Sequence, residues 1–530
     1  ADSGKPVPPE ILNWLLAQTH KLGSPEPGAL LRRYCQQFAA EDRAALGEFV
    51  LTQWIEQDTR RKYTEAQARL MAQQEAQTIY SMAQQDANST KSLEAYEELC
   101  FQGIWSQCVG SAAKQKGILA LAAACCGEGA VKIAGDFLKQ WYGYRAAQCR
   151  ALVVMLASLE HSAAIQLLLS VAGRFRTKSI REEAEKQVKL LAERKGWTVD
   201  ELADRTVPTA GFDETLSLEL DYGPRQFTAR LRPDLSITLV DADGKPLKTL
   251  PEPRKDDDAE LAQAAKKTFS TAKSELKKLV SQQTSRLYEA MCTERTWNYA
   301  DWDAYVYQHP IVRGLCQRLV WAVVDGDGPG KMFRPLDDGT LTDEQDEQVA
   351  VPGDARLRLA HGSLISAETS AAWQQHLADY QVEPLFAQFG RGRYALTDDK
   401  QDAAELSDFE GHLIEAFKLR GLATRLGYTR GQTGDGGWFS EYEKTLAGLG
   451  LKVVLRFSGN GLPEENRTVA LIGMHFSPTG GDSGGMSFDR PGIPLREAPS
   501  VLLSECYHEL QTIAAAGSGY DPDWQRKVEP

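Results

Sequence analysis

Two arginines that flank a glycine form the most suggestive polar group of the sequence. Arg391-Gly392-Arg393 follows a segment with several aromatic residues. Guanidinium groups bind phosphates and carboxylates through N–H donors held in one plane. Together with Arg420, which lies further along the chain, they predict a site for a small anionic ligand. The alternative is that these charges form structural ion pairs on a solvated face, since paired charges are often structural.

Four residues carry side chains that could act as an acid or a base: His309, Glu410, His412 and Glu505. Glu410 or Glu505 would serve as a base, and His412 would help to hold the ligand, if folding placed them beside the arginines. His309 stands directly before a proline, where an imidazole is suited either to proton transfer or to capping a helix start. No complete catalytic motif connects these residues, so we leave enzymatic activity open.

A glycine-rich segment, Gly481-Asp482-Ser483-Gly484-Gly485, spells the nucleophile motif of trypsin-like proteases. That chemistry needs a histidine base and a buried aspartate held by two β-barrels, normally in a secreted protein with disulfides. The first part of this chain is rich in helical patterns, and His361 lacks the usual surroundings of such a base. We therefore favour a glycine-rich loop without catalytic role, because short motifs transfer poorly without their context.

Metal and nucleotide motifs are incomplete in this chain. His508-Glu509 lacks the second histidine of a zinc-protease helix, and Gly330-Lys331 lacks the rest of a phosphate-binding loop. The nine cysteines, among them Cys125-Cys126, show none of the two-residue spacings that zinc sites normally use. We therefore predict no metal site and no cofactor.

Composition and charge restrict the class of protein. The 530 residues carry a net charge of −13, which disfavours a general binder of nucleic acid or of anionic membranes. Basic runs, such as the one between Arg174 and Arg181, support only a weaker reading as a nucleic-acid-associated regulator. No apolar run is long enough to span a bilayer, and an odd number of scattered cysteines favours reduced thiols in the cytoplasm. The chain begins with Ala rather than Met, as a trimmed piece of a longer protein would.

The hydrophobic periodicity predicts an α+β multidomain protein in four parts. Residues 1–195 show one helical pattern after another, which predicts a HEAT-like α-solenoid, with an irregular helical bundle as the alternative. Residues 196–255 begin with a capping box at Thr198-Val199-Asp200-Glu201 and then switch to a period of two, which predicts a small antiparallel β-meander. Residues 256–300 predict one long connecting helix, and residues 301–530 a C-terminal α+β domain.

The C-terminal domain is organised around residues 302–334. There the pattern predicts a helix with Pro310 in its first turn, a buried strand over 319–324 and a returning strand that ends at Arg334. We further expect a helix over 409–426, strands over 451–457 and 468–476, and a last helix over 501–515.

Several short stretches follow one another in an order that resembles a known bacterial family. They are Gly196-Trp197-Thr198, Asp200-Glu201-Leu202-Ala203-Asp204-Arg205-Thr206-Val207-Pro208-Thr209, Leu220-Asp221-Tyr222-Gly223-Pro224-Arg225, Asp243-Gly244-Lys245, Leu250-Pro251, His309-Pro310, Arg318-Leu319-Val320-Trp321, Phe386-Ala387-Gln388 with Arg391, Phe409-Glu410-Gly411-His412, Ser504-Glu505 and Asp521-Pro522-Asp523-Trp524. On these motifs the chain resembles the domain-of-unknown-function 4132 family, whose members include molybdate metabolism regulator-like proteins and often carry a WGR domain. The resemblance covers roughly residues 195–530.

The resemblance implies partners rather than a reaction. The genes of family members resemble those found in gene neighbourhoods that also encode MoxR-type AAA+ ATPases and von Willebrand A proteins. The resemblance therefore implies a protein partner of one of these kinds. No Trp-Gly-Arg tripeptide occurs here, so we expect no nucleic acid to bind through that module. Our first hypothesis is a cytoplasmic bacterial interaction or regulatory protein, an adaptor or substrate of an AAA+ system. The second is an enzyme or sensor that binds a nucleotide-like or phosphorylated ligand at the arginines.

Overall fold

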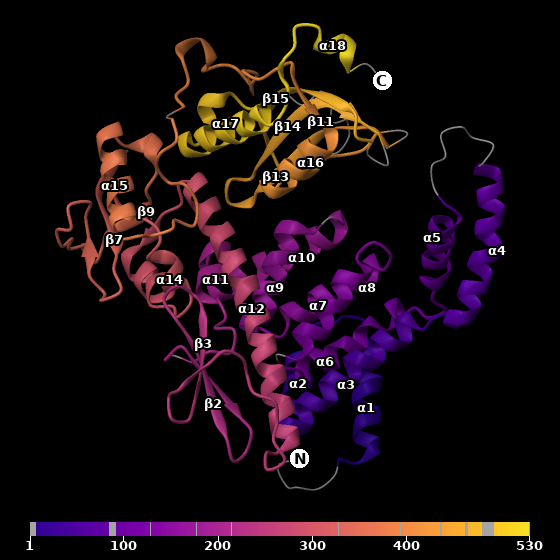
Figure 1. The fold of residues 1–530 in the computed structure, drawn as a ribbon. Helices are drawn as coiled ribbons and strands as arrows, with labels where there is room; N and C mark the ends of the chain where they lie inside the picture. The colour runs from indigo at the N-terminus through magenta and orange to yellow at the C-terminus, as the bar shows by residue number, and fades with distance from the viewer. Residues whose placement is uncertain are drawn as a thin grey trace. The chain divides into compact units, whose positions relative to one another are not determined.

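The computed structural model describes residues 7–83, 92–127, 129–175, 177–213, 215–326, 328–392, 394–434, 437–461, 465–479 and 492–528. The chain divides into two compact units, Ala1–Pro208 and Thr209–Pro530, which we call unit 1 and unit 2. As predicted, the fold is of the α+β class, with helices in unit 1 and antiparallel sheets in unit 2 (Figure 1). Within the described residues, none of the helices has both the length and the apolar character needed to cross a membrane.

Unit 1 is built from helices that bury one apolar face each. They are α1 (Pro9–Leu22), α2 (Ala29–Cys35), α3 (Ala40–Thr59), α4 (Glu65–Ala83), α5 (Leu93–Trp105), α6 (Leu119–Cys125), α7 (Gly129–Trp141), α8 (Ala146–Ala157), α9 (Ser162–Arg174), α10 (Lys178–Lys195) and α11 (Val199–Arg205). Most of them share one core, which includes Leu51, Leu119 and Leu152. The helices α4 and α5 pack on each other around a small cluster of their own, centred on Ala72 and Phe101.

The predicted capping box begins α11. The hydroxyl of Thr198 accepts a hydrogen bond from the backbone N–H of Glu201 at 3.1 Å, and the Glu201 carboxylate accepts one from the backbone N–H of Thr198 at 2.7 Å. Both backbone donors would otherwise lack partners at the helix start, which is why this spacing marks a helix boundary so well.

Unit 2 starts with the predicted β-meander and long helix. The strands β1 (Ser217–Asp221), β2 (Gln226–Leu231), β3 (Ile237–Asp241) and β4 (Pro246–Leu247) pair antiparallel in chain order. The helix α12 (Ala259–Cys292) follows, and the Asp258 carboxylate caps it by accepting two backbone N–H groups. A negative charge at this position also complements the positive end of the helix dipole.

The second sheet of unit 2 has the order β5-β9-β6-β7-β8. Its strands are β5 (Trp297–Asn298), β6 (Trp321–Asp325), β7 (Gly328–Pro335), β8 (Leu341–Thr342) and β9 (Arg356–Leu359), and α13 (Tyr299–Trp302) and α14 (Val312–Cys316) lie between β5 and β6 in the chain. The helix α15 (Ala367–Asp379) packs Trp373 against Val320, which precedes β6, and against Met332 of β7.

The structure contains the predicted β6–β7 hairpin, but α14 and β6 both begin later than expected. Pro310 lies in a turn, and α14 starts at Val312, because the His309 imidazole accepts the backbone N–H groups of Ile311 and Val312 and closes the turn there. The strand begins at Trp321 rather than at residue 319. The backbone N–H and C=O of Val320 pair instead with the side-chain amide of Gln388.

The third sheet has the order β12-β13-β14-β15-β11-β16, and β10 pairs with β15. Its strands are β10 (Glu405–Leu406), β11 (His412–Glu415), β12 (Thr429–Arg430), β13 (Phe439–Leu446), β14 (Leu451–Asn460), β15 (Thr468–Pro478) and β16 (Gly519–Tyr520). The chain ends with α17 (Ser500–Ala515) and α18 (Trp524–Lys527), and α17 packs on β15, β11 and α16 (Ala416–Arg425). The long strands β14 and β15 and the helix α17 agree with the prediction.

The helix predicted over residues 409–426 is wrong in its first part. The segment enters a turn, Gly411 adopts a φ of 78°, and Leu413 and Ile414 then pair with Ala470 and Val469 of β15 as strand β11. Only the second part is helical, as α16. The apolar run from Leu413 fits the pattern of a buried strand as well as that of a helix. Pairing with β15, which is distant in the sequence, determines that the run forms a strand.

Candidate functional site

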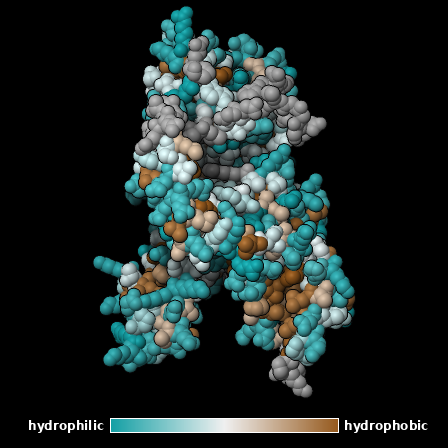
Figure 2. Space-filling view, turned by 90° about the vertical axis from the view of Figure 1, so that its right-hand side faces the viewer, coloured by the Kyte–Doolittle hydropathy of each residue, from teal (hydrophilic) through white to brown (hydrophobic). Residues whose placement is uncertain are grey.

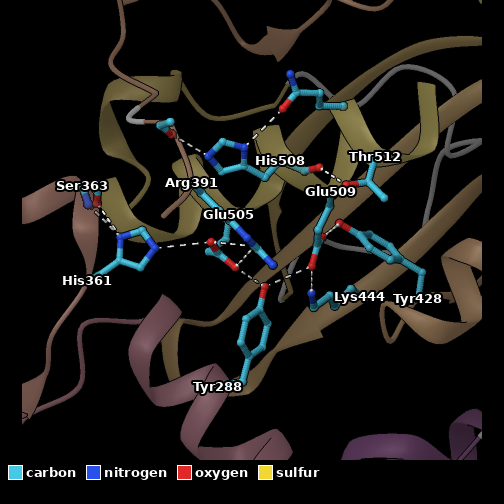
Figure 3. A network of polar contacts seen from close by, with 12 residues as sticks. Tyr288, His361, Ser363, Arg391, Tyr428, Lys444, Glu505, His508, Glu509 and Thr512 are labelled. Carbon is cyan, nitrogen blue, oxygen red and sulfur yellow. Dashed lines mark hydrogen bonds and ion pairs between the residues drawn. The ribbon is translucent and has the colours of Figure 1, made fainter. Parts of the chain in front are cut away.

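Two buried carboxylates on α17 organise the network of polar contacts drawn in Figure 3. Glu505 and Glu509 are four residues apart, so they lie on one face of the helix, and they are 1% and 4% exposed. Both lie within the apolar interior of unit 2, beside residues such as Leu502, Cys506 and Leu510. A carboxylate is costly to bury unless charges and hydrogen bonds compensate it.

Three side chains from distant parts of unit 2 compensate Glu505. The guanidinium of Arg391 donates from Nη1 to both carboxylate oxygens, at 3.0 and 2.8 Å. The hydroxyl of Tyr288, on α12, donates to Oε2 at 2.8 Å, and Nε2 of His361 lies 3.3 Å from Oε1. Burial alone would raise the pKa of the Glu505 carboxyl, but the hydrogen bond from His361 and the positive charge of Arg391 outweigh it and lower the pKa below its usual value.

The orientation of His361 follows from its second ring nitrogen. Nδ1 accepts the backbone N–H of Ser363 at 3.2 Å, and therefore cannot carry a proton in that arrangement. The proton of the neutral ring then lies on Nε2, from which it is donated to Glu505. His361 is itself 4% exposed, so the pair is closed off from solvent.

Ser363, His361 and Glu505 have the residue types of a hydrolase triad. The Ser363 hydroxyl lies 2.7 Å from Nδ1 of His361. However, the backbone N–H of the same serine occupies that nitrogen, and the Ser363 residue is 8% exposed. A nucleophile must reach its substrate, so this arrangement fits a loop cap that fixes the imidazole better than acyl transfer.

Glu509 forms the inner half of the network. The ammonium of Lys444, on β13, lies 2.7 Å from Oε1, and the hydroxyl of Tyr428 donates to Oε2 at 2.6 Å. Burial would lower the pKa of Lys444, yet the charge of Glu509 raises it above its usual value and keeps the ammonium protonated. Burial, and then the nearby carboxylates, raise the pKa of Tyr288 and of Tyr428, so both phenols remain hydrogen-bond donors.

The charges of the network cancel. The carboxylates of Glu505 and Glu509 face one guanidinium and one ammonium. The network thus extends from Arg391, whose side chain is 42% exposed, to Lys444, whose side chain is 15% exposed. The arrangement connects α12, β13, α17 and the loops that carry His361 and Arg391. Such a network fixes the relative positions of these elements, because removing the charge of Arg391 or of Lys444 leaves a buried carboxylate without its counter-charge.

The structure brings together two of the residues singled out from the sequence, Arg391 and Glu505. Arg393 and the segment Gly481-Asp482-Ser483-Gly484-Gly485 lie outside the described residues. Arg420 lies on α16 with its guanidinium 4.6 Å from the centre of the Phe417 ring.

The remaining three acid–base candidates make their described contacts elsewhere. The ring of His412 bonds through Nδ1 to the carbonyl of Phe409 at 3.0 Å. Glu410 is exposed, in the turn before β11. His309 uses Nδ1 as an acceptor for two backbone N–H groups at the turn before α14, which is the capping role weighed for it above.

The sequence analysis did not find the partners Tyr288, Tyr428, Lys444 and Glu509. A signal for Lys444 exists, since it alternates with Tyr442 and Leu446 and so occupies an inward position of a strand. Elsewhere, in the described part of the chain, no three His, Cys, Asp or Glu side chains are arranged to hold a metal ion.

Comparison with known proteins supports part of the family resemblance. Residues 244–428 match the family model described as "Domain of unknown function (DUF4132)". The chain is also 31% identical over 309 residues to "Uncharacterized protein YehI" of Escherichia coli (strain K12). That alignment covers 57% of this chain and 25% of the relative, so the chain spans about a quarter of the relative's length. No solved structure matches the chain.

The matched segment contains the outer part of the network. Tyr288, His361, Arg391 and Tyr428 lie within residues 244–428, whereas Lys444 and both glutamates follow it. The family model therefore covers side chains that contact α17 but not α17 itself.

Proposed function

We propose that the chain is a bacterial interaction or regulatory protein whose unit 1 binds a protein partner. The observation that carries this proposal is an apolar surface formed by α1 and α2. It consists of Ile11, Trp14, Leu22, Leu30 and Tyr34, which are 45–63% exposed. We call these five residues the α1–α2 surface.

One aromatic contact joins the two helices of the α1–α2 surface. The rings of Trp14 and Tyr34 meet edge to face, with centroids 5.4 Å apart. Leu30 and Tyr34 are four residues apart on α2, and Ile11 and Trp14 are three apart on α1, so each pair lies on one helix face. Figure 2 shows apolar side chains gathered on one part of the surface, at the lower right of the view.

An exposed apolar surface with two aromatic anchors is typical of a binding site. Single exposed apolar residues are common on soluble proteins, but contiguous ones mark interaction sites. Tryptophan and tyrosine are also the residues that most often dominate binding energy at interfaces.

The polar network of unit 2 supports the same proposal. Glu505 and Glu509 are fully engaged by neighbouring side chains, and His361 has both ring nitrogens occupied. Groups that are already paired in this way are suited to holding a fold rather than to turning over a substrate.

The finer part of the proposal comes from the family resemblance. The partner would be a MoxR-type AAA+ ATPase or a von Willebrand A protein, with this chain as adaptor or substrate in the cytoplasm. In this proposal the helices of unit 1 act as a HEAT-like solenoid that displays the α1–α2 surface. Association with WGR domains and a role related to molybdate metabolism belong to the same expectation.

A pull-down from the host cell tests this function with three forms of the full chain. In the double variant Trp14→Ser/Tyr34→Ser we expect a defined partner of the wild type to be lost. The control is Tyr144→Ser, which changes a more exposed tyrosine of unit 1 outside the α1–α2 surface, and it should keep the partner. Equal recovery of the same proteins on all three forms would refute the proposal. A partner outside the AAA+ and von Willebrand A classes would refute only its finer part.

A further inference from the structure

The guanidinium of Arg334, on β7, is buried with one of its three nitrogens unpartnered. Nε donates to Nε2 of His376, on α15, at 3.1 Å, and Nη1 donates to the backbone carbonyl of Gln317 at 3.4 Å. Nη2 is buried as well, and among the described residues it has no hydrogen-bond acceptor. The residue is 4% exposed, so bulk water does not supply one. A buried donor in this state is unusual in a native protein.

The positive charge of Arg334 also lacks a counter-charge. Burial lowers the pKa of Arg334 below its usual value, but an arginine still remains protonated at neutral pH. Within the part of the chain that the structure describes, no carboxylate forms an ion pair with it, and Asp337 and Asp346 act on it only from a distance. An unpaired buried charge is strongly destabilising. An anion beside Nη2 would supply both the acceptor and the counter-charge.

The neighbouring His376 does not compensate the charge. Its Nε2 accepts the proton of Arg334 Nε, and its Nδ1 lies 3.4 Å from Oδ1 of Asp346. Burial, and then the charge of Arg334, lower the pKa of His376, so the ring is neutral. The Asp346 side chain is 57% exposed and accepts the hydroxyl of Tyr380 at 2.8 Å. Asp346 therefore lies on the far side of a neutral imidazole from the guanidinium, with its charge screened by water.

A second buried hydroxyl without a partner lies on the same face of the sheet. Thr342, on β8, stands directly opposite Arg334 in the antiparallel β7–β8 pair. Side chains at such positions leave the same face with their Cβ atoms about 5 Å apart. Thr342 is 6% exposed, and its hydroxyl has no hydrogen-bond partner among the described residues. The ring of Tyr380 covers the guanidinium, with its centre 4.6 Å from Cζ, so the surroundings of Nη2 admit only a small ligand.

We propose that Arg334 binds a monovalent anion of the size of chloride at Nη2, with the hydroxyl of Thr342 as a second donor. Such an anion accepts N–H and O–H donors and carries the single negative charge that the buried guanidinium lacks. A water molecule would accept the same donors but would leave the charge uncompensated. The site shares no residue with the α1–α2 surface, so it stands or falls apart from the proposed protein partner.

The first test locates the anion directly in the wild-type full chain. Bromide takes the place of chloride in a protein site, and its anomalous X-ray scattering distinguishes it from water. Crystals soaked in sodium bromide should show an anomalous peak within hydrogen-bond distance of Nη2 of Arg334. The absence of an anomalous signal at this position would overturn the proposal.

The second test measures the effect of the anion in solution. Sodium chloride is replaced by sodium gluconate at constant ionic strength, because gluconate is too large for a closed site. A ligand that binds only the folded state stabilises it by mass action. Hydrogen exchange of the β7 and α15 backbones should therefore be roughly tenfold slower in chloride, at a concentration about ten times the Kd. Equal exchange rates in the two salts would contradict the proposal.

Variants assign the chloride effect to this site. Arg334→Met removes the charge and should abolish the difference between the two salts. Thr342→Val keeps the shape, removes one donor and should reduce the difference, and it serves if Arg334→Met does not fold. The control is Arg225→Met, since Nε of Arg225 already donates to Asp257 at 3.0 Å, and this variant should keep the full difference. An undiminished difference in Arg334→Met or in Thr342→Val would refute the assignment.

Discussion

Glu505 and Glu509 stand one helical turn apart on α17, and the single hydroxyl of Tyr288 lies 2.8 Å from a carboxylate oxygen of the first and 3.3 Å from one of the second. A phenol has one proton to donate, so the two carboxylates share it unequally. The shorter distance assigns the proton to Glu505. Glu509 then depends on Lys444 and Tyr428 for its compensation.

The dependence of Lys444 on Glu509 predicts a large stability effect. Glu509→Gln leaves the Lys444 ammonium, whose side chain is only 15% exposed, without its counter-charge, and we expect a loss of about 3 kcal/mol in the free energy of unfolding of unit 2. Hydrogen exchange of the α17 backbone, read by mass spectrometry, measures this loss in the full chain. The double variant Glu509→Gln/Lys444→Met removes both charges and should recover part of the loss.

A neighbouring ion pair offers the matched control for Glu509→Gln. Glu443 and Lys452 lie 2.8 Å apart on β13 and β14, and both are partly exposed. Glu443→Gln should cost less than about 1 kcal/mol, because water screens the remaining lysine. Equal losses in Glu443→Gln and Glu509→Gln would show that the buried network does not hold unit 2 together.

The lowered pKa of His475 predicts how the stability of unit 2 depends on pH. Burial, helped by the positive charges of Arg456 and Lys452, lowers the pKa of this imidazole to about 4. In the unfolded chain the pKa of the group is about 6.5, so the unfolded state binds more protons between these two values. Stability must therefore fall as the pH falls from about 6.5 to about 4, by about 3 kcal/mol from this residue.

The variant His475→Gln should lack that part of the pH dependence. Denaturant midpoints of the full chain between neutral pH and the acid limit measure the slope for both forms. A variant with the same slope as the wild type would contradict the assignment of this proton uptake to His475.

Two glycines with the same backbone angle allow the stability cost of backbone strain to be measured separately from that of a steric clash. Gly244 and Gly411 both adopt a φ of 78°. A Cβ atom at Gly244 would meet nothing within 4 Å, whereas one at Gly411 would approach the Trp524 ring to 2.6 Å. Gly244→Ala should cost about 1 kcal/mol from the left-handed backbone alone.

Gly411→Ala should cost more than Gly244→Ala, because the Trp524 ring must also move. Unfolding midpoints of the two variants in the same denaturant give the comparison. An equal loss in both would mean that the contact between Gly411 and Trp524 contributes nothing to the packing of α18 on the sheet.

Local patterns predicted many elements of this fold well. The capping box at Thr198, the alternation over β1 to β3 and the long α12 are set by neighbours in the sequence, and they lie where expected. Residues 409–426 were mistaken for one helix because Leu413 and Ile414 are buried by pairing with β15, a contact that no local pattern reveals.

The candidate site could be predicted only in part. Arg391 and Glu505 were both singled out, although 114 residues separate them, but nothing in the sequence indicated that they contact each other. Lys444 carries a signal only after β13 is recognised as a strand, and β13 was not predicted. A buried network is assembled by tertiary packing. The sequence can therefore point to single members of it, whereas only the structure shows that they contact one another.

The central claim is that the α1–α2 surface binds a protein partner, and site-specific photo-cross-linking in the host cell tests it most directly. Benzoylphenylalanine replaces Tyr34 in one form of the full chain and Tyr144 in another, and both positions are exposed in unit 1. We predict one defined cross-linked protein from position 34 and none from position 144. The same products from both positions, or no product from position 34, would contradict the account.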